Sequence, residues 1–306
     1  MRSRNRLEGT ALAALVAAVL VPQSAGALVG DRFGDFGLDG SLRTITAGTY
    51  NYDFPPMFGE DNPGDGFSQT LLRLNAGGEP ADWFIYEVHG VQSLSFSTLG
   101  ESAVQGPGLF ATGGMTRRYR ALDLSWEWAS EPDIQAGMVL DRCSLKFILP
   151  WFDLTVGRQA ITFGKAYFWN PLDVYLAFDP TQFDRDYKAG ADAVRVDIPL
   201  GAFSGINLVG VAGRRLTREG AYRDGGFAGA SWYGSSVLAR VYTNQWDWDF
   251  ALQGGKVYGG YQAGAAASGE VDAVAVRAEA GPVQQVGVRG RERVGQERRE
   301  ERLPLD

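Results

Sequence analysis

The sequence has few of the residues that build disulfides, metal sites and acid–base centres. It holds one cysteine, Cys143, and one histidine, His89, in 306 residues. A single cysteine cannot form an intramolecular disulfide, and we interpret Cys143 as a small apolar filler. The cysteine and histidine spacings of zinc sites and of c-type haem attachment do not occur. We therefore expect neither a metal site nor a cofactor.

Sequence signatures of catalysis are missing as well. There is no G-x-S-x-G nucleophile elbow, and a catalytic triad would depend on His89 alone. The glycine-rich stretch 259–270 lacks the GK[ST] of a phosphate-binding loop and is interpreted as strand and turn. The acidic stretch 60–65 does not follow the spacing of an EF-hand loop. The chain is therefore predicted to have no catalytic residue and not to be an enzyme.

Long apolar runs are also missing. No segment holds 18 consecutive apolar residues, which excludes a transmembrane helix. Three arginines occur within the first six residues, followed by the apolar run 10–21 and by the small residues Ala25 and Ala27. That run is shorter than the ~20 residues a membrane span needs. This pattern is typical of a secretory signal peptide, and we predict cleavage after Ala27.

Glycine and aromatic residues are abundant instead. Glycine accounts for 41 of the 306 residues, and aromatic residues for 12%. Frequent glycine disfavours long helices, whereas antiparallel strands with many turns and aromatic belts at membrane interfaces explain both excesses. The chain carries a net charge of −7, or −9 without residues 1–27, which contain three Arg and one Glu. This negative charge argues against a nucleic-acid partner.

Apolar and polar residues alternate along many short segments, as expected for strands with two different faces. In 121–130, Trp126 and Trp128 share one face and Glu127 lies on the other. A soluble sandwich also alternates, but a tryptophan pair would crowd its dry core, whereas a lipid interface favours tryptophan. We predict an all-β fold, an antiparallel transmembrane β-barrel with about 12–14 visible strands that is incomplete. The expected strands are 38–49, 68–76, 82–92, 121–129, 138–148, 152–162, 190–198, 205–212, 226–233, 235–243, 246–254, 257–265 and 271–280.

The insert 163–189 interrupts this rhythm. Capping patterns at Asn170 and Asp179 indicate two short helical turns. If each expected strand crosses the barrel once, the insert lies at the opposite end from the long connections 50–67 and 93–120; the alternative is a miscounted strand near 138–150. We expect it to fold into the lumen as a constriction, with a solvated surface loop as the alternative. The predicted pore-lining or constriction residues are Glu127, Arg158, Arg195 and Asp197 on strands, and Asp184, Arg185 and Lys188 in the insert.

Residues 153–201, DLTVGRQAITFGKAYFWNPLDVYLAFDPTQFDRDYKAGADAVRVDIPLG, also carry a resemblance. This segment resembles the signature region of a family of porin-like bacterial outer-membrane proteins, many of them uncharacterised. Members show a GRQ…G strand followed by an NP-D…DP…DR-Y-GADA-R…PLG segment. The resemblance implies an outer-membrane β-barrel and no particular solute. Outside residues 153–201, the chain shows only a general similarity to the family.

The charged C-terminal segment 282–306 has no aromatic residue and ends in Asp306, whereas barrels of this kind usually close with a strand that ends in an aromatic residue. It is either a disordered charged tail or the sign of a truncated or frame-shifted chain that lacks its last strands. We favour the second, because a closed barrel leaves no unpaired edge in lipid. The predicted organisation is a signal peptide at 1–27, a β-barrel domain at 28–281 with an ordered insert at 163–189, and a tail at 282–306.

These features favour a porin-like channel in the outer membrane of a Gram-negative bacterium, through which small hydrophilic solutes diffuse passively. Two alternatives stay open. One is a barrel that sheathes a partner such as a multihaem cytochrome, and the other is an exported β-rich binding protein outside the membrane. The expected partners are outer-membrane lipid and lipopolysaccharide, the barrel assembly machinery and small hydrophilic solutes, with a homo-oligomer as a further option and no nucleic acid.

Overall fold

The computed structural model describes residues 26–31, 34–50, 64–98, 116–131, 133–163, 171–175, 188–216, 227–271, 274–281 and 283–284. Within these ranges the chain forms sixteen strands and one short 3-10 helix. The prediction of an all-β chain with a large antiparallel sheet is confirmed. None of the described segments forms a helix that is long and apolar enough to cross a membrane.

Fourteen of the strands belong to one sheet. They are β1 (Gly26–Gly30), β2 (Gly37–Tyr50), β3 (Gly64–Ala81), β4 (Phe84–Ser97), β5 (Ser125–Ser130), β6 (Ile134–Ile148), β7 (Asp153–Gln159), β8 (Ala191–Pro199), β9 (Ser204–Val211), β12 (Ser236–Gln245), β13 (Trp248–Val257), β14 (Gly260–Val271), β15 (Val274–Ala280) and β16 (Val283–Gln284). The strands β10 (Arg214–Leu216) and β11 (Phe227–Ala230) form a separate pair, and η1 (Thr116–Tyr119) is the 3-10 helix.

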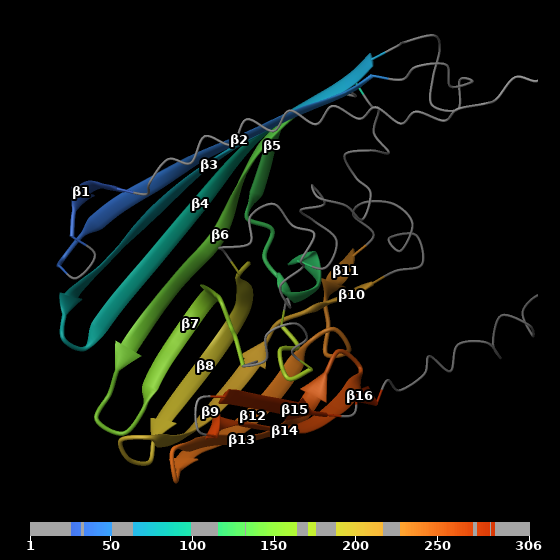
Figure 1. Cartoon of the computed structure of the whole chain (residues 1–306). Coiled ribbons are helices and arrows are strands. Elements are labelled where there is room, and N and C mark those ends of the chain that lie inside the picture. The colour runs from blue at the N-terminus through green and yellow to red at the C-terminus, as the bar shows by residue number, and fades with distance from the viewer. Residues whose placement is uncertain are drawn as a thin grey trace, which may run out of the picture.

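The main sheet follows the chain from neighbour to neighbour. Its order is β1-β2-β3-β4-β6-β7-β8-β9-β12-β13-β14-β15, with β5 added to β6 and β16 added to β14. The sheet curls strongly, which gives it a concave and a convex face (Figure 1). β1 and β15 end this order, and the described residues do not pair them with one another.

Each of the thirteen expected strand ranges overlaps a strand of the structure. One of them, 226–233, coincides with β11, which lies outside the main sheet. The sequence analysis does not predict β1, β10 and β16, whose five, three and two residues show no clear alternation. β1 begins inside the range predicted as signal peptide, and β16 lies inside the range predicted as tail.

The strand β5 corrects the predicted strand count. It pairs with residues 135–139 of β6, and β7 pairs with residues 143–148 along the same edge of β6. β4 occupies the other edge of β6 over its whole length. β5 and β7 therefore lie end to end beside β6, and β5 does not make a crossing of its own. Alternation reveals that a segment is a strand, but not how far across the sheet it runs.

This correction moves the insert to the other end of the sheet. Without a crossing at β5, the long connections 51–63, 98–124, 160–190 and 212–235 all leave the sheet at one end (Figure 1). The short connections 82–83, 149–152, 200–203, 246–247 and 272–273 all lie at the opposite end. The insert therefore leaves the sheet at the same end as the other long connections, and the expected position at the opposite end rested on a miscounted crossing. We call the two ends of the sheet the long-loop end and the short-turn end.

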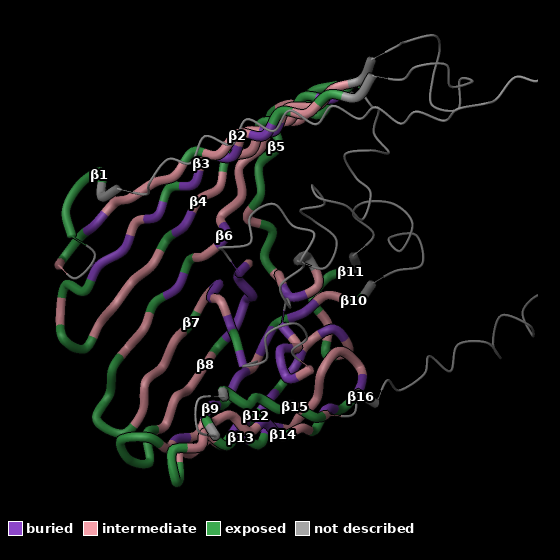
Figure 2. The backbone as a smooth tube through the Cα atoms, viewed as in Figure 1, coloured by how far each residue is buried: buried purple, intermediate pink, exposed green. Residues whose placement is uncertain are grey.

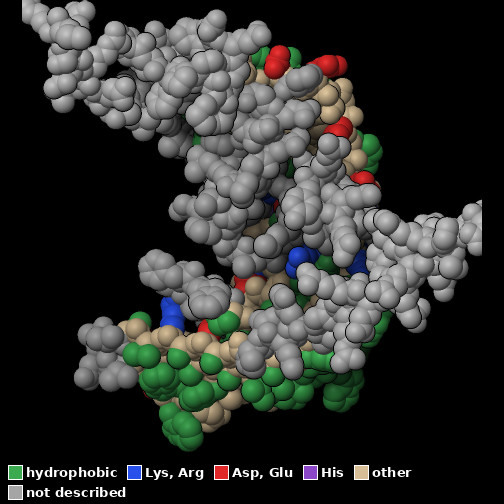
Figure 3. Space-filling view, turned by 90° about the vertical axis from the view of Figure 1, so that its right-hand side faces the viewer, with side chains coloured by type: hydrophobic (Ala, Val, Ile, Leu, Met, Phe, Trp, Pro, Cys, Tyr) green, Lys and Arg blue, Asp and Glu red, His purple; other side chains and the backbone are tan. Residues whose placement is uncertain are grey.

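The convex face is apolar. Large side chains from neighbouring strands point outward and keep more than a third of their surface exposed; they include Leu42, Leu74, Leu94, Trp126, Leu145, Val156, Val194, Leu208, Val241 and Leu252. The lower surface of the molecule, over β13 and β14, shows this layer as a band of hydrophobic side chains (Figure 3). The described residues place no second sheet over this face. In the described residues, the face of Trp126 and Trp128 singled out in the sequence therefore does not pack into a core between two sheets.

Aromatic residues mark the short-turn end. Each of four successive turns there carries one, namely Trp83, Trp151, Phe203 and Trp246, and these side chains are 57–85% exposed. Trp246 and the following Asp247 both have positive φ, as a tight two-residue hairpin turn requires. At the long-loop end, Trp232 and Tyr261 are also exposed. Exposed aromatic side chains thus stand at both ends of the apolar face.

Candidate functional site

A transverse row of concave side chains crosses six neighbouring strands. From β7 to β14 it consists of Asp153, Asp197, Asn207, Arg240, Gln253 and Gly264. Directly opposed residues of antiparallel strands have Cβ atoms about 4.5–5.5 Å apart, so adjacent members of the row are neighbours in space. The β7–β9 half and the β12–β14 half of this row have different surroundings.

The β7–β9 half is polar and partly open. Lys146 Nζ lies 2.8 Å from Asp153 Oδ2, and Arg195 Nε lies 2.8 Å from Asp197 Oδ1. The amide of Asn207 also donates to Asp197. These four charged side chains keep 24–35% of their surface exposed. Because these charges are paired and solvated, they form a hydrophilic wall without a strong electrostatic field of either sign.

The β12–β14 half holds the insert by its backbone. Arg240 Nη1 donates to the carbonyl of Phe163 at 2.9 Å, and Gln253 Nε2 donates to the carbonyl of Leu172 at 2.8 Å. Gln262 Nε2, one strand further along, donates to the carbonyl of Pro171 at 2.8 Å. Long polar side chains that face the concave side thereby satisfy carbonyls of a segment that has no sheet partner of its own.

A notch in the sheet receives Leu172. This side chain is fully buried and packs against Ala251 and Ala266. A Cβ atom added at Gly264 would lie 2.4 Å from Leu172 Cδ2, far inside van der Waals contact. The absence of a side chain at this member of the row is therefore what allows the insert to lie on the wall. The predicted helical turn at 170–173 is a simple turn at Pro171–Leu172, and the second predicted turn lies outside the described residues.

A dry cluster forms next to the row, towards the long-loop end. Phe163 and Tyr175 of the insert, with the preceding Ile161, pack with Tyr119 of η1 and with concave residues of three strands, among them Val209, Val211 and Leu238. Tyr119 and Tyr175 meet edge to face at 5.4 Å between ring centroids. Buried residues gather where the insert meets the sheet (Figure 2). This cluster keeps part of the concave face free of water.

A buried ion pair closes the insert on itself. Lys188 Nζ contacts both carboxylate oxygens of Asp173, and the two side chains are only 4% and 1% exposed. Burial raises the pKa of Asp173 above its ordinary value even though the ammonium opposes this shift. Burial likewise lowers the pKa of Lys188. Desolvation thus outweighs the attraction between the two ions, as is common for buried pairs.

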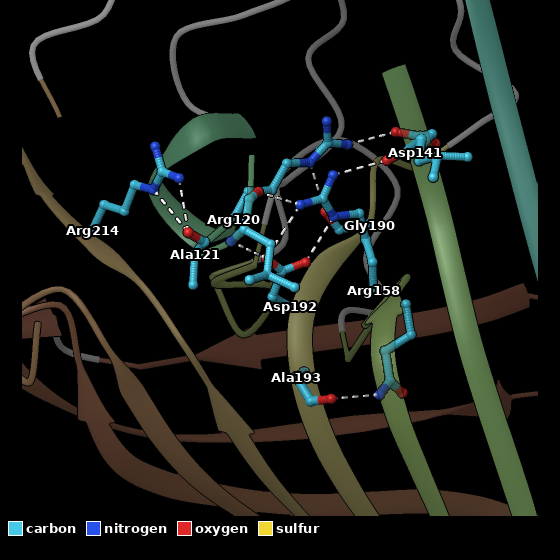
Figure 4. A network of polar contacts seen from close by, with 11 residues as sticks. Arg120, Ala121, Asp141, Arg158, Gly190, Asp192, Ala193 and Arg214 are labelled. Atoms are coloured by element: carbon cyan, nitrogen blue, oxygen red, sulfur yellow. Dashed lines mark hydrogen bonds and ion pairs between the residues drawn. The ribbon is translucent and has the colours of Figure 1, made fainter. Parts of the chain in front are cut away.

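A second polar network ties residues 120–122, which precede β5, to β6, β7 and β8 (Figure 4). Arg158 donates to Asp192 at 2.7 Å and to the carbonyls of Leu140 and Leu122 at 2.8 and 2.6 Å. Arg120 donates to Asp141 and to the carbonyl of Gly190. Arg158 lies near the end of β7, beside residues 120–124, which precede β5. Its guanidinium donates to backbone carbonyls that the N–H groups of a continuous strand would otherwise satisfy.

The structure separates the predicted pore-lining residues into groups. Arg195 and Asp197 lie on the open part of the concave wall, as described above. Glu127 is exposed on β5, opposite Gly137 and outside the row. Lys188 is buried against Asp173 and does not reach the open wall. Asp184 and Arg185 lie outside the described residues.

The prediction for Arg158 needs correction. Its side chain is only 2% exposed, and it is held by Asp192 and two backbone carbonyls. A residue in this position joins strands within the wall rather than lining an open surface. The alternation of the sequence placed Arg158 among the pore-lining side chains. Because β7 ends close to Arg158 and residues 120–124 lie beside it, this side chain instead connects two segments of the chain.

Sequence reasoning missed the residues that hold the insert: Leu172, Arg240, Gln253, Gln262 and Gly264. One signal was present in the sequence. The concave positions of β9 and β12 change from polar, at Asn207 and Arg240, to apolar, at Val209, Val211 and Leu238. A water-filled interior favours polar residues, so apolar concave residues indicate that something covers them.

Chemically, the described site can present paired charges and backbone carbonyls to a polar solute. No group of three or more His, Cys, Asp or Glu residues in the described ranges is arranged to hold a metal ion. Comparisons of the chain with protein-family models, with curated proteins and with solved structures found no match. The function therefore has to be inferred from the residues themselves.

Proposed function

We propose that the protein is a porin-like channel of the bacterial outer membrane, through which small hydrophilic solutes diffuse passively. The observation that carries this proposal is the opposite character of the two faces of one curled sheet. The convex face is apolar and the concave face is polar with paired charges. Lipid would cover the first, and solutes would pass along the second.

The dimensions of the sheet support a membrane position. β13 has ten residues between a turn with exposed Trp246 and a turn next to exposed Tyr261. At ~3.3 Å per residue and a tilt of ~40°, ten residues span about 25 Å along the membrane normal. This matches the height of the apolar band between the aromatic girdles of outer-membrane barrels.

The two unequal ends support an orientation. Outer-membrane barrels have short turns in the periplasm and longer loops outside the cell. The five short connections at one end and the four long connections at the other follow this asymmetry. We propose that the short-turn end faces the periplasm and that the insert enters from the extracellular side.

The docked insert favours a channel over a sheath for a partner protein. A sheath needs a wide interior, whereas residues 161–163 and 171–175 lie on the concave wall and are held there by Arg240 and Gln253. In this proposal the insert narrows the lumen near the row, and Arg195 and Asp197 line the passage that remains open.

The test uses the full chain expressed in a Gram-negative host. We expect the protein in the outer-membrane fraction, with faster migration in SDS before boiling than after it. Purified protein added to planar bilayers should give stepwise conductance, and liposomes that contain it should swell in small sugars but not in large ones. A chain that is soluble without detergent and gives no conductance would favour the exported binding protein instead.

A further inference from the structure

Arg240 differs from the other buried arginines and lysines of the described residues in having no carboxylate within ion-pair distance. It lies on β12 in the middle of the transverse row and is 7% exposed. Its Nη1 donates to the carbonyl of Phe163, and its guanidinium carbon lies 5.2 Å from the centroid of the Phe163 ring. Its Nε is buried and has no hydrogen-bond partner. Only one of the five donor hydrogens of this guanidinium is therefore used in a described hydrogen bond.

The other buried arginines and lysines of the described residues have acidic partners. Contacts of 3.4 Å or less join cation and carboxylate in Arg73–Asp141, Arg120–Asp141, Arg158–Asp192 and Lys188–Asp173. Glu279 and Asp249 interact electrostatically with Arg240, but in the described residues neither comes within the 4.0 Å of an ion pair. A buried cation without a contacting anion is costly, which indicates that an anion completes this site.

The geometry of the guanidinium indicates the kind of anion. Because the Phe163 carbonyl takes one hydrogen of Nη1, both donors of the side edge, Nε–H and one hydrogen of Nη2, are unused in the described hydrogen bonds. These two parallel N–H groups match the two oxygens of a carboxylate in a bidentate pair. The guanidinium carbon lies 5.2 Å from the centroid of the Phe163 ring, and Nε on the side edge is buried without a hydrogen-bond partner.

We propose that Arg240 is the binding site for a carboxylate solute at the narrow part of the channel. This inference rests on the proposed function, because a solute path along the concave face is what brings anions to this residue. Arg195 lies on the open part of the wall and is engaged with Asp197, so it would guide anions without holding them. Arg240 is then the residue that gives the channel its preference for small organic acids.

A titration tests binding without depending on conductance. The full-length protein in detergent micelles is labelled with ¹⁵N-arginine, and the Nε–H resonance lost in Arg240→Lys is assigned to Arg240. Sodium acetate should shift this resonance saturably, with sodium chloride at equal ionic strength as the reference. Arg240→Gln should weaken acetate binding at least about tenfold, since a bidentate charged pair is lost. Arg43→Gln, which removes a charge elsewhere on the sheet, should leave acetate binding unchanged.

Several outcomes would overturn the proposal. These are no saturable shift in the wild-type protein, equal acetate binding in Arg240→Gln, or a response to inorganic phosphate but not to acetate. Acetate binding that appears only in Glu279→Gln would also overturn it, because the chain's own carboxylate would then occupy the site. In bilayers, Arg240→Gln should lower the acetate-to-potassium permeability ratio. A wild-type protein without conductance would refute the channel, while the titration would still decide the site.

Discussion

Replacing Lys188 with methionine leaves the Asp173 carboxylate buried without the ammonium that contacts both its oxygens. The carboxylate is 1% exposed and the lysine 4%, so neither can regain much hydration while the insert stays docked. Removing one partner of such a buried pair costs about 3–5 kcal/mol. Since the pair joins the two ends of the segment 173–188, this loss should act on docking of the insert and leave the sheet intact.

The double variant Asp173→Asn/Lys188→Met should behave differently. Desolvation outweighs the attraction between these ions, as the raised pKa of Asp173 and the lowered pKa of Lys188 indicate. Replacing both ions with neutral groups of similar size is then expected to change docking by less than about 1 kcal/mol or to strengthen it. The difference between the single and double variants measures the coupling within the pair.

Hydrogen exchange read by mass spectrometry on the folded protein in micelles is the assay. Amides of 172–175 and 188–190 should exchange faster in Lys188→Met by a factor of about 10²–10⁴, and near the wild-type rate in the double variant. Amides of β3 and β4, which are remote from the insert, serve as the internal control. Equal acceleration in the single and double variants would refute the reasoning, because the loss would then come from packing and not from an uncompensated charge.

The pKa of Asp173 also sets the sign of a pH effect. A carboxyl group whose pKa is raised in the docked state stabilises docking below its unfolded pKa, and this contribution is lost as the pH rises through the docked-state pKa. Amide exchange of 172–175, corrected for its intrinsic pH dependence, should therefore show more protection near pH ~4 than at neutrality. Asp173→Asn should flatten this difference, and an unchanged slope would assign it to another group.

Three further predictions concern the wall. Gly264→Val should expel Leu172 from its notch and raise conductance. Gly210→Val is the control, because an added Cβ there meets nothing within 4 Å, and it should leave conductance unchanged. Equal effects of the two variants on conductance would argue against the notch. Val194→Arg places a charge on the convex face and should lower the stability by about 2–4 kcal/mol near mid-membrane. The gel-mobility shift should then occur at a lower temperature. Asn244→Arg, which places the same charge on the concave face, should be tolerated. Arg195→Glu should shift the reversal potential in a salt gradient, and an unchanged potential would remove this residue from the passage.

The local sequence predicted the sheet well because strand formation and its two faces depend on neighbours in the chain. Trp126, Val194 and Leu252 alternate with polar residues, and all three are exposed on the convex face. Turn residues such as Trp246 and Asp247 set hairpin ends within two residues. These features need no long-range information, since the period of two decides which face each side chain takes.

Tertiary structure decided everything that depends on which strands meet. β5 does not cross the sheet, because it shares one edge of β6 with β7. The alternation of apolar and polar residues looks alike in β5 and β7 and does not reveal this arrangement. The notch for Leu172 at Gly264 joins positions 92 residues apart, and Gln253 meets the carbonyl of Leu172 across 81 residues. Such contacts depend on the curl and register of the whole sheet, and a one-residue slip would turn every one of these side chains to the other face.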